Sequence, residues 1–262
     1  MLDIDIGAWP TFEAYLAGAV FSGRPFDYQT GFYVRTIAGL LDGGTITDQE
    51  NPRSYGPGTL ATPGVRGSAR GITITGFAYG NTPGTLAALV EQFGGILADE
   101  RETGALSFRE LGRWRHLIVK RGRTFNIARR GRDLIAPYTL ALLADDQRIY
   151  GDAMESTSWG TSCEVINRGT YPAPVVVEIR GSAAGGYTIN GPDGAQVIVS
   201  RALASGEPHR YDSDEATLTI GGVAQATGLT RADRLEAKPG VRGFSVSGGA
   251  ELRVIGNDTY NP

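Results

Sequence analysis

The residues of this chain that could carry out chemistry are few and lie far apart. Cysteine occurs once, at Cys163, and histidine twice, at His116 and His209. Transition-metal sites need several cysteine, histidine or carboxylate ligands that converge on one point. Nucleophilic catalysis needs a serine or cysteine beside a base. We therefore predict no metal site and no catalytic nucleophile, with Cys163 as a buried or half-buried side chain and both histidines as packed or semi-exposed strand residues.

Carboxylates come closest together at Asp212, Asp214 and Glu215. Paired carboxylates perform the acid–base and nucleophilic steps of glycoside hydrolysis, and a β-sandwich can hold such a site. The spacing of these three acids, however, is typical of a hairpin turn, where neighbouring exposed acids need no catalytic explanation. We interpret them as a turn and keep a hydrolase that uses Asp212 or Glu215 as a third hypothesis.

Glycine-rich stretches are frequent, since the chain contains 38 glycines and 13 prolines. None has the Lys-Ser/Thr ending of a P-loop, and none joins a strand to a helix in the Rossmann manner. They indicate turns between short strands, and we predict no cofactor. The 262 residues, of which 41 % are apolar, suffice for two modest domains with packed cores.

The chain shows no targeting or membrane-spanning pattern. No apolar run approaches the roughly 20 residues that span a bilayer, and the first ten residues are acidic where a signal peptide is basic. A single cysteine cannot form an internal disulfide, which fits a reducing cytoplasm. We expect no membrane association.

Basic residues are concentrated in the segment Arg109–Arg132, which holds nine Lys or Arg and one acid. Residues 1–150 contain 16 basic and 15 acidic residues, a net charge of +1, and residues 151–262 contain 9 and 13, a net charge of −4. No recognition helix or RNP-type aromatic pair accompanies the basic segment, so sequence-specific nucleic-acid binding is not expected. We interpret the segment as a solvated strand face and an electropositive contact surface in an assembly.

Strand patterns dominate the first half. Alternating or β-branched residues predict strands at 32–37, 70–75, 106–110, 113–120, 124–128 and 134–143, with a hairpin turn at Lys120–Arg123. The alternation in Arg113–Lys120 predicts a sheet with one dry and one wet face. One helix is expected at about 83–94, with Thr82 as N-cap, Pro83 at its first position and Gly94-Gly95 at its end. The polar segment Asp42–Pro63 is too long for an ordinary loop in a compact domain and indicates a loop that is either functional or mobile.

The second half predicts a β-sandwich. Residues 175–179 form a continuous Val/Ile run, and short strand patterns alternate with turns at 187–190, 196–200, 210–211, 217–220, 243–247 and 251–255. An Asn-Arg-Gly turn at Asn167–Gly169 leads into the first of these strands. We place the domain boundary near residue 150, with Tyr150–Ser158 as a linker.

Seven stretches, taken in order, resemble one known family. They are GITITGFAYGNTPGTLAALVEQFGGIL, LSFRELGRWRHLIVKRGRTFNIARR, LALLADDQRIYGD, NRGTYPAPVVVEIRG, GYTIN, GEPHRYDSDEATLTIGG and KPGVRGFSVSGGAELRV. Their order and spacing are similar to those of the distal tail proteins of siphophages. The chain departs from that pattern at Gln147, where proline is common, and lacks the long second-half insertion that adds a carbohydrate-binding module in some relatives.

The resemblance implies a mainly β fold with two domains. Residues 1–150 would form a β-barrel-like belt domain, related to tail-tube folds and containing the one helix, and residues 151–262 a galectin-like β-sandwich. Six copies would form a ring that contacts the tail tube protein on one side and the tail-tip hub or tail-associated protein on the other, with the tape measure protein as a further possible partner. The protein would be assembled in the host cytoplasm and reside in the virion as a structural, non-enzymatic component.

We predict that subunit and tube contacts come from the polar loop and the basic segment. The candidate residues are Asp42, Asp48, Glu50, Arg53 and Tyr55 in the loop, and Arg113, Arg115, Lys120, Arg121 and Arg123 in the basic segment. The alternative function is a carbohydrate-binding adhesion module acting through the sandwich. Its candidate stacking residues are Trp159, Tyr171, Tyr187, Tyr211 and Phe244.

Overall fold

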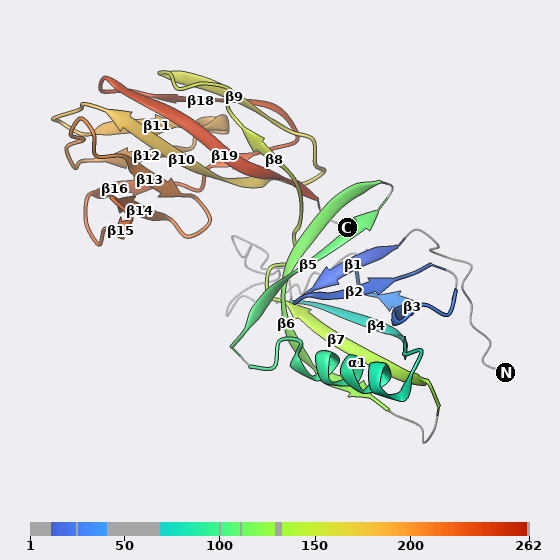
Figure 1. The fold of residues 1–262 in the computed structure, drawn as a ribbon. Coiled ribbons are helices and arrows are strands. Elements are labelled where there is room, and N and C mark those ends of the chain that lie inside the picture. Colours follow the sequence, from blue (N-terminus) through green and yellow to red (C-terminus); the bar gives the residue numbers. More distant parts are fainter. Residues whose placement is uncertain are drawn as a thin grey trace, which may run out of the picture. The chain divides into compact units, whose positions relative to one another are not determined.

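The computed structural model describes residues 12–24, 26–40, 69–99, 101–110, 112–128 and 133–260. The chain divides into two compact units, one ending at Ile149 and the other running from Tyr150 to Asn261. We call them the barrel unit and the sandwich unit. The predicted fold class is confirmed: the chain is mainly β, its N-terminal part is a barrel that contains an α-helix, and its C-terminal part is a two-sheet sandwich (Figure 1). No helix among the described residues is long and apolar enough to cross a membrane.

The barrel unit is a ring of strands. Its order is β6-β5-β1-β2-β3-β4-β7, and a further pairing of β6 with β7 closes the ring. All neighbours are antiparallel except β2 and β3. The strands are β1 (Glu13–Leu16), β2 (Ala19–Ser22), β3 (Gly31–Ala38), β4 (Arg70–Tyr79), β5 (Thr103–Glu110), β6 (Arg113–Ile127) and β7 (Ile135–Ala144).

Apolar side chains that alternate along these strands fill the barrel. Leu117 on β6 and Leu140 on β7 are fully buried, and the Phe21 and Phe32 rings lie 5.2 Å apart. The helix α1 (Pro83–Gly95) packs on β4 and β7 and contributes Phe93, which is also fully buried. Helix and barrel therefore share one core.

The helix begins where the sequence predicts. The Thr82 hydroxyl accepts a hydrogen bond from the Thr85 N–H at 3.1 Å, and the Thr85 hydroxyl accepts one from the Thr82 N–H at 3.0 Å. This reciprocal capping box satisfies two donors that would otherwise lack partners at a helix N-terminus. Pro83 occupies the first turn, where the missing N–H costs nothing.

The predicted hairpin at Lys120–Arg123 is wrong. The chain continues through this segment as one strand, β6, which is 15 residues long. Gly122 does not adopt the positive φ of a turn, and a Cβ atom there would lie 2.9 Å from the carbonyl oxygen of Ala141. The glycine therefore permits a close approach between β6 and β7 rather than a chain reversal.

The sandwich unit consists of two sheets. One has the order β15-β14-β13-β10-β19-β8, with β17 paired to β10, and the other has the order β16-β12-β11-β18-β9. The longer strands are β8 (Ile149–Glu155), β9 (Ser162–Asn167), β10 (Ala173–Gly181), β18 (Gly240–Val246) and β19 (Ala250–Tyr260). The shorter ones are β11 (Tyr187–Asn190), β12 (Gln196–Val199), β13 (His209–Asp212), β14 (Thr217–Ile220), β15 (Val223–Ala224), β16 (Leu229–Ala232) and β17 (Glu236–Ala237), with a 3-10 turn at Pro192–Gly194.

Both sheets contribute to one apolar core. Val177 on β10 and Val254 on β19 face Ile189 on β11 and Val197 on β12, and all four are fully buried. The Val/Ile run that predicted a buried sandwich strand thus corresponds to β10, whose alternate side chains enter this core.

The predicted linker Tyr150–Ser158 is also wrong, because most of it is strand β8. Met154 is buried in the sandwich core. Ser156 forms two hydrogen bonds with Val254 of β19, one through its backbone N–H at 2.9 Å and one through its hydroxyl, which accepts from the Val254 N–H at 3.1 Å. Small and polar residues here pair with a neighbouring strand, a long-range contact that local composition does not reveal.

Candidate functional site

Strand β6 contains all the described residues that the sequence singled out as contact candidates. Arg113 and Arg123 are exposed, whereas Arg115, Lys120 and Arg121 are half-buried. The other five candidates, Asp42, Asp48, Glu50, Arg53 and Tyr55, lie outside the described residues.

The expected division of β6 into a wet arginine face and a dry face needs correction. Arg115 has the same parity along the strand as Leu117 and Val119, which are buried in the barrel, and its Nε atom is itself buried. The opposite face exposes Trp114 and Ile118, by 43 % and 45 %. Successive side chains of a strand point to opposite faces, so arginines two residues from core leucine and valine lie on the core side.

The exposed face of β6 belongs to an apolar patch that the sequence reasoning missed. Trp114 contacts Tyr15 of β1 with ring centroids 5.4 Å apart, and Tyr15 pairs in register with Val20 of β2. Tyr15 and Val20 are exposed by 38 % and 42 %. The signal was present in the alternation of Trp114 and Ile118 with buried Leu117 and Val119. Clustered exposed aromatic residues are typical of interaction surfaces.

Three of the candidates come together where the β6–β7 ladder is interrupted. Arg121 pairs with Leu142, but the next pair is Phe125 with Leu140, so the three residues 122–124 of β6 face a single residue of β7. Beside this bulge lies a hollow of about 820 Å³, lined by β4, β6, β7 and Ala98. Lys120, Arg121 and Arg123 all line it, and we call it the basic hollow.

The three cations of the basic hollow have different surroundings. The Lys120 Nζ atom forms a 2.8 Å ion pair with a carboxylate oxygen of Asp145. The guanidinium of Arg121 lies 3.5 Å from the centroid of the Phe125 ring, a cation–π contact. Within the described part of the chain, neither Arg121 nor Arg123 forms an ion pair. The hollow thus retains positive charge that the surrounding described residues do not neutralise.

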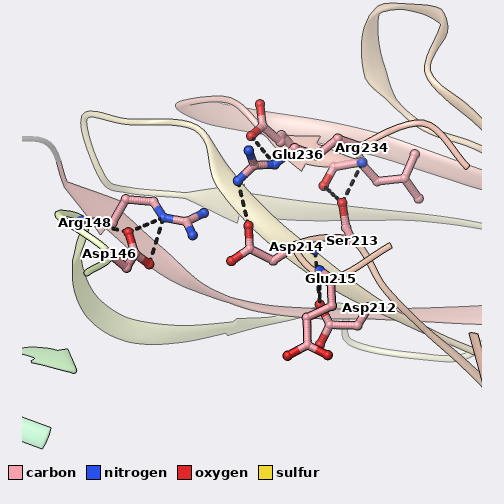
Figure 2. A network of polar contacts seen from close by, with 9 residues as sticks. Asp146, Arg148, Asp212, Ser213, Asp214, Glu215, Arg234 and Glu236 are labelled. Atoms are coloured by element: carbon pink, nitrogen blue, oxygen red, sulfur yellow. Dashed lines mark hydrogen bonds and ion pairs between the residues drawn. The ribbon is translucent and has the colours of Figure 1, made fainter. Parts of the chain in front are cut away.

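The acidic turn after β13 has a structural role in the sandwich unit (Figure 2). The Asp212 carboxylate accepts hydrogen bonds from the N–H groups of Asp214 and Glu215, at 3.0 and 3.4 Å. Arg234 binds Asp214 at 2.7 Å and Glu236 at 2.9 Å. These carboxylates stabilise the turn and its neighbouring segment, as the hairpin interpretation predicts.

Figure 2 also shows the polar contacts of Ser213 and of Asp146. The Ser213 hydroxyl, which is buried, donates to the Leu235 carbonyl and accepts from the Leu235 N–H, both at 2.6 Å. In the barrel unit, Asp146 accepts hydrogen bonds from the backbone N–H and the Nε of Arg148, at 3.0 and 2.8 Å. This local pairing closes the turn after β7, at the position where the chain departs from the tail-protein pattern.

The remaining chemistry-bearing residues are packed, as expected. Cys163 is half-buried, and burial raises the pKa of its thiol. Burial lowers the pKa of both His116 and His209. His209 is fully buried, and its Nδ1 atom lies 2.9 Å from the Tyr187 hydroxyl. The described residues contain no group of three or more His, Cys, Asp or Glu side chains placed to hold a metal ion.

The aromatic residues considered for sugar stacking are mostly inaccessible. Tyr187, Tyr211 and Phe244 are buried in the sandwich core. Trp159 lies under two guanidinium groups, with Arg180 4.4 Å and Arg253 5.3 Å from its ring centroid. Stacking on a sugar requires an open ring face, so these four residues offer little surface for it.

Neither a family model nor a curated protein matches the chain by sequence. Structural comparison, in contrast, identifies the fold of a barrel followed by a sandwich as that of a hub protein from a phage adsorption apparatus. The solved structure is the Dit protein (gp 19.1) of phage SPP1, presented as a paradigm for the hubs of phages that infect Gram-positive bacteria. The two share 15 % sequence identity and a TM-score of 0.67, over 93 % of this chain and 98 % of that one.

Two structures of the phage P2 baseplate in its activated conformation, one with Ca and one with Sr, also match. Each has 9 % identity and covers 93 % of this chain and 97 % of the matched chain, with TM-scores of 0.49 and 0.48. The fold assignment rests on the SPP1 protein, whose similarity extends over both units.

Proposed function

We propose that this protein is a structural component of a phage tail and acts as a hub at the tail tip or baseplate. The observation that carries the proposal is the match to the SPP1 hub protein over nearly the full length of both chains. A match confined to one unit would indicate only a common β module, whereas this one includes barrel and sandwich in the same order. The tail-protein pattern in the sequence supports the same function independently of the fold.

Within this function, we propose that six copies form a ring through their barrel units. The ring joins the tail tube protein on one side to the tail-tip hub or tail-associated protein on the other, with the tape measure protein as a further neighbour. A cyclic ring needs two different, complementary surfaces on each copy. The exposed apolar patch around Trp114 is a candidate for one of these subunit surfaces, and the basic hollow is a candidate contact for a second protein of the tail. The protein is non-enzymatic and becomes part of the virion after assembly in the host cytoplasm.

Neither rival function is favoured. A hydrolase would need a pair of free carboxylates, but Asp212 accepts from turn N–H groups and Asp214 pairs with Arg234, which leaves only Glu215 of this turn. A carbohydrate-binding module would need open aromatic rings on the sandwich, and four of the five candidate rings are buried or covered by guanidinium groups. We therefore keep the structural function alone.

The experiment is mass photometry and negative-stain electron microscopy of the purified full-length protein, with and without its tube protein. We expect a six-fold ring, alone or on the end of tubes. Charge reversal at Arg121 and Arg123 should weaken the contact surfaces without affecting the core. Arg115 is not used for this reversal, because its Nε atom is buried and a carboxylate at that position is expected to destabilise the barrel. A protein that stays monomeric at high concentration, both alone and beside tubes, would contradict the proposed ring.

A further inference from the structure

The basic hollow contains a stretch of backbone that neighbouring strands leave open. The β5 ladder ends at the pair Thr103–Lys120, so no residue of β6 beyond Lys120 has a partner on β5. On the other side, residues 122–124 have no register partner on β7. Gly122, Arg123 and Thr124 therefore have no register partner on β5 or on β7. Unpaired strand backbone is a template for pairing with another extended chain.

The side chains of the hollow add donors for a negatively charged ligand. Arg121 lies with its guanidinium over the Phe125 ring, and such stacking uses the face of the guanidinium. The N–H groups at its edge stay available for the bidentate geometry that matches a carboxylate. Arg123 is exposed and lies two residues further along the same strand. Lys120 contributes less, because Asp145 already pairs with it.

Together these features favour a peptide over a free ion or a nucleic acid. A volume of about 820 Å³ far exceeds that of a single carboxylate or phosphate. Binding of single-stranded nucleic acid relies on base stacking against open aromatic rings. The ring beside the hollow is Phe125, which is covered by Arg121 on one side and lies 4.4 Å from the Phe93 ring.

We propose that the basic hollow binds an acidic, extended polypeptide segment of a partner protein. Its carboxylates pair with Arg121 and Arg123, and its backbone lies along residues 122–124. The inference rests on the proposed function, since it names the chemistry of one partner of the hub. It also assigns separate roles to the two halves of β6: the 121–124 segment binds this partner, whereas the Trp114 patch does not.

The test uses the full-length protein and a fluorescein-labelled oligoglutamate peptide, measured by fluorescence anisotropy at low salt. We expect saturable binding that weakens at least about tenfold in the double variant Arg121→Gln/Arg123→Gln, because two charge-assisted contacts are lost. The matched control is Arg35→Gln/Arg210→Gln, which removes the same charge from exposed positions outside the hollow. We expect the control to change affinity by no more than about twofold, the size of a general charge effect.

Three results would overturn the inference. They are no saturable binding to the native protein, equal losses in both double variants, and tighter binding of an oligothymidylate that the hollow variant abolishes. If Arg121→Gln unfolds the strand by removing the Phe125 contact, Arg123→Glu alone replaces it. Arg123 is exposed, so its reversal leaves the core intact and must still weaken peptide binding.

Mass photometry of the same samples separates this inference from the proposed function. If the hollow variant forms rings but loses the peptide, the hollow binds a partner other than a neighbouring copy. If the native protein binds the peptide but never forms rings, the proposed ring fails and the peptide site stands.

Discussion

The barrel unit and the sandwich unit differ in how their surface arginines are neutralised. In the sandwich, five arginines form ion pairs with acids of the same unit: Arg168 with Asp258, Arg180 with Glu251, Arg231 with Asp233, Arg234 with Asp214 and Glu236, and Arg253 with Glu155 and Glu178. In the described part of the barrel, Arg109, Arg113, Arg121 and Arg123 form no ion pair. Pairing is incomplete in both units, since Arg201, Arg210 and Arg242 of the sandwich form no ion pair with a described residue either and Arg24 and Arg148 of the barrel are paired. The unpaired arginines of the barrel, however, are concentrated on the neighbouring strands β5 and β6, where they remain available to a partner.

Exposed aromatic residues follow the same division. The large aromatic side chains that are exposed among the described residues, Tyr15, Tyr28 and Trp114, all belong to the barrel unit. Tyr28 is exposed by 70 % and has a positive φ of 62°, a backbone conformation that costs free energy for a residue other than glycine. In the sandwich, Trp159 is instead covered by arginines. Contact surfaces for assembly are therefore expected on the barrel.

The largest expected effect is a loss of stability in one unit that leaves the other unit unchanged. Phe93 contacts Phe32, Phe125 and Tyr138, with ring centroids 6.0, 4.4 and 5.3 Å apart. Phe93→Ala should lower the free energy of unfolding of the barrel by about 4 kcal/mol, through lost burial and the cavity left behind. The matched control, Phe244→Ala, removes a buried ring from the sandwich core.

Hydrogen exchange resolved by segment measures this effect. Each substitution should accelerate exchange mainly in its own unit, so that Phe93→Ala loosens β6 and leaves β10 and β19 protected. Equal acceleration of exchange in both units for either variant would mean that the barrel and the sandwich unfold together. The two units could then not be compared as separately stable domains.

The next largest effect concerns the Asn-Arg-Gly turn at the end of β9 in the sandwich. Asn167 is buried and its side-chain amide forms four hydrogen bonds. It donates to the carbonyls of Tyr171 and Ala237 at 2.8 and 2.7 Å, and accepts from the N–H groups of Gly169 and Thr259 at 2.8 and 3.3 Å. Asn167→Ala leaves buried backbone groups unpaired and should destabilise the sandwich by about 3 kcal/mol.

Chemical denaturation followed by Trp fluorescence measures the loss, and Asn190→Ala is the control. Asn190 is half-buried, on β11, and its amide hydrogen-bonds only to the side chains of Gln196 and Ser245. We expect this control to cost less than about 1 kcal/mol, because water can replace those partners. Similar losses at both positions would show that the Asn167 network is not what holds the turn.

Elements fixed by local chemistry could be predicted from the sequence. The helix was predictable because its start signals are local: Thr82 caps a backbone N–H, and Pro83 stands at the first helical position, where no N–H is needed. The Asn-Arg-Gly turn was predictable for a similar reason. Gly169 also leaves no space for a Cβ atom, since the carbonyl of Thr259 lies against it. Strands with alternating or continuous β-branched residues, such as β4 and β10, were likewise evident from their pattern.

Features that depend on partners distant in sequence could not be predicted. A glycine flanked by arginines has the local appearance of a turn, and only the approach of Ala141 shows why Gly122 lies in a continuous strand. Strand β8 has linker-like composition and is held by Val254, about a hundred residues away. The basic hollow lies beside the bulge at Gly122. The sequence therefore predicted its basic residues as contact candidates but could not predict that they line a hollow.

A smaller, pH-dependent effect should appear in the sandwich, and substitution of His209 separates it from the similar effect of His116 in the barrel. Burial holds the pKa of His209 below its usual value of about 6.5. Between the folded-state pKa and about 6.5, the unfolded chain binds more protons than the folded one, so this histidine destabilises the sandwich as the pH falls through that window. Above pH 6.5 it has no such effect.

Denaturation of the native protein and of His209→Gln at several pH values tests this assignment. Glutamine can still accept a hydrogen bond from the Tyr187 hydroxyl but does not titrate. The difference in unfolding free energy between the two proteins should change between pH 7.5 and 5, in favour of the variant at the acidic end. A constant difference across this range would contradict a buried neutral histidine.

The smallest expected effect provides the sharpest comparison of the two surfaces. Arg180 and Arg123 are both exposed strand arginines, but Arg180 is paired with Glu251 at 2.9 Å and Arg123 has no ion pair among the described residues. Arg180→Gln should cost less than about 1 kcal/mol, as expected for an exposed pair, and should leave ring formation unchanged. Arg123→Gln should be neutral for stability, because it breaks no internal contact, yet weaken assembly or partner binding. Thermal unfolding and mass photometry of the two variants decide the point. If Arg180→Gln impaired assembly as much as Arg123→Gln, a paired arginine would matter as much as an unpaired one, and the difference in surface charge between the units would no longer locate the partners.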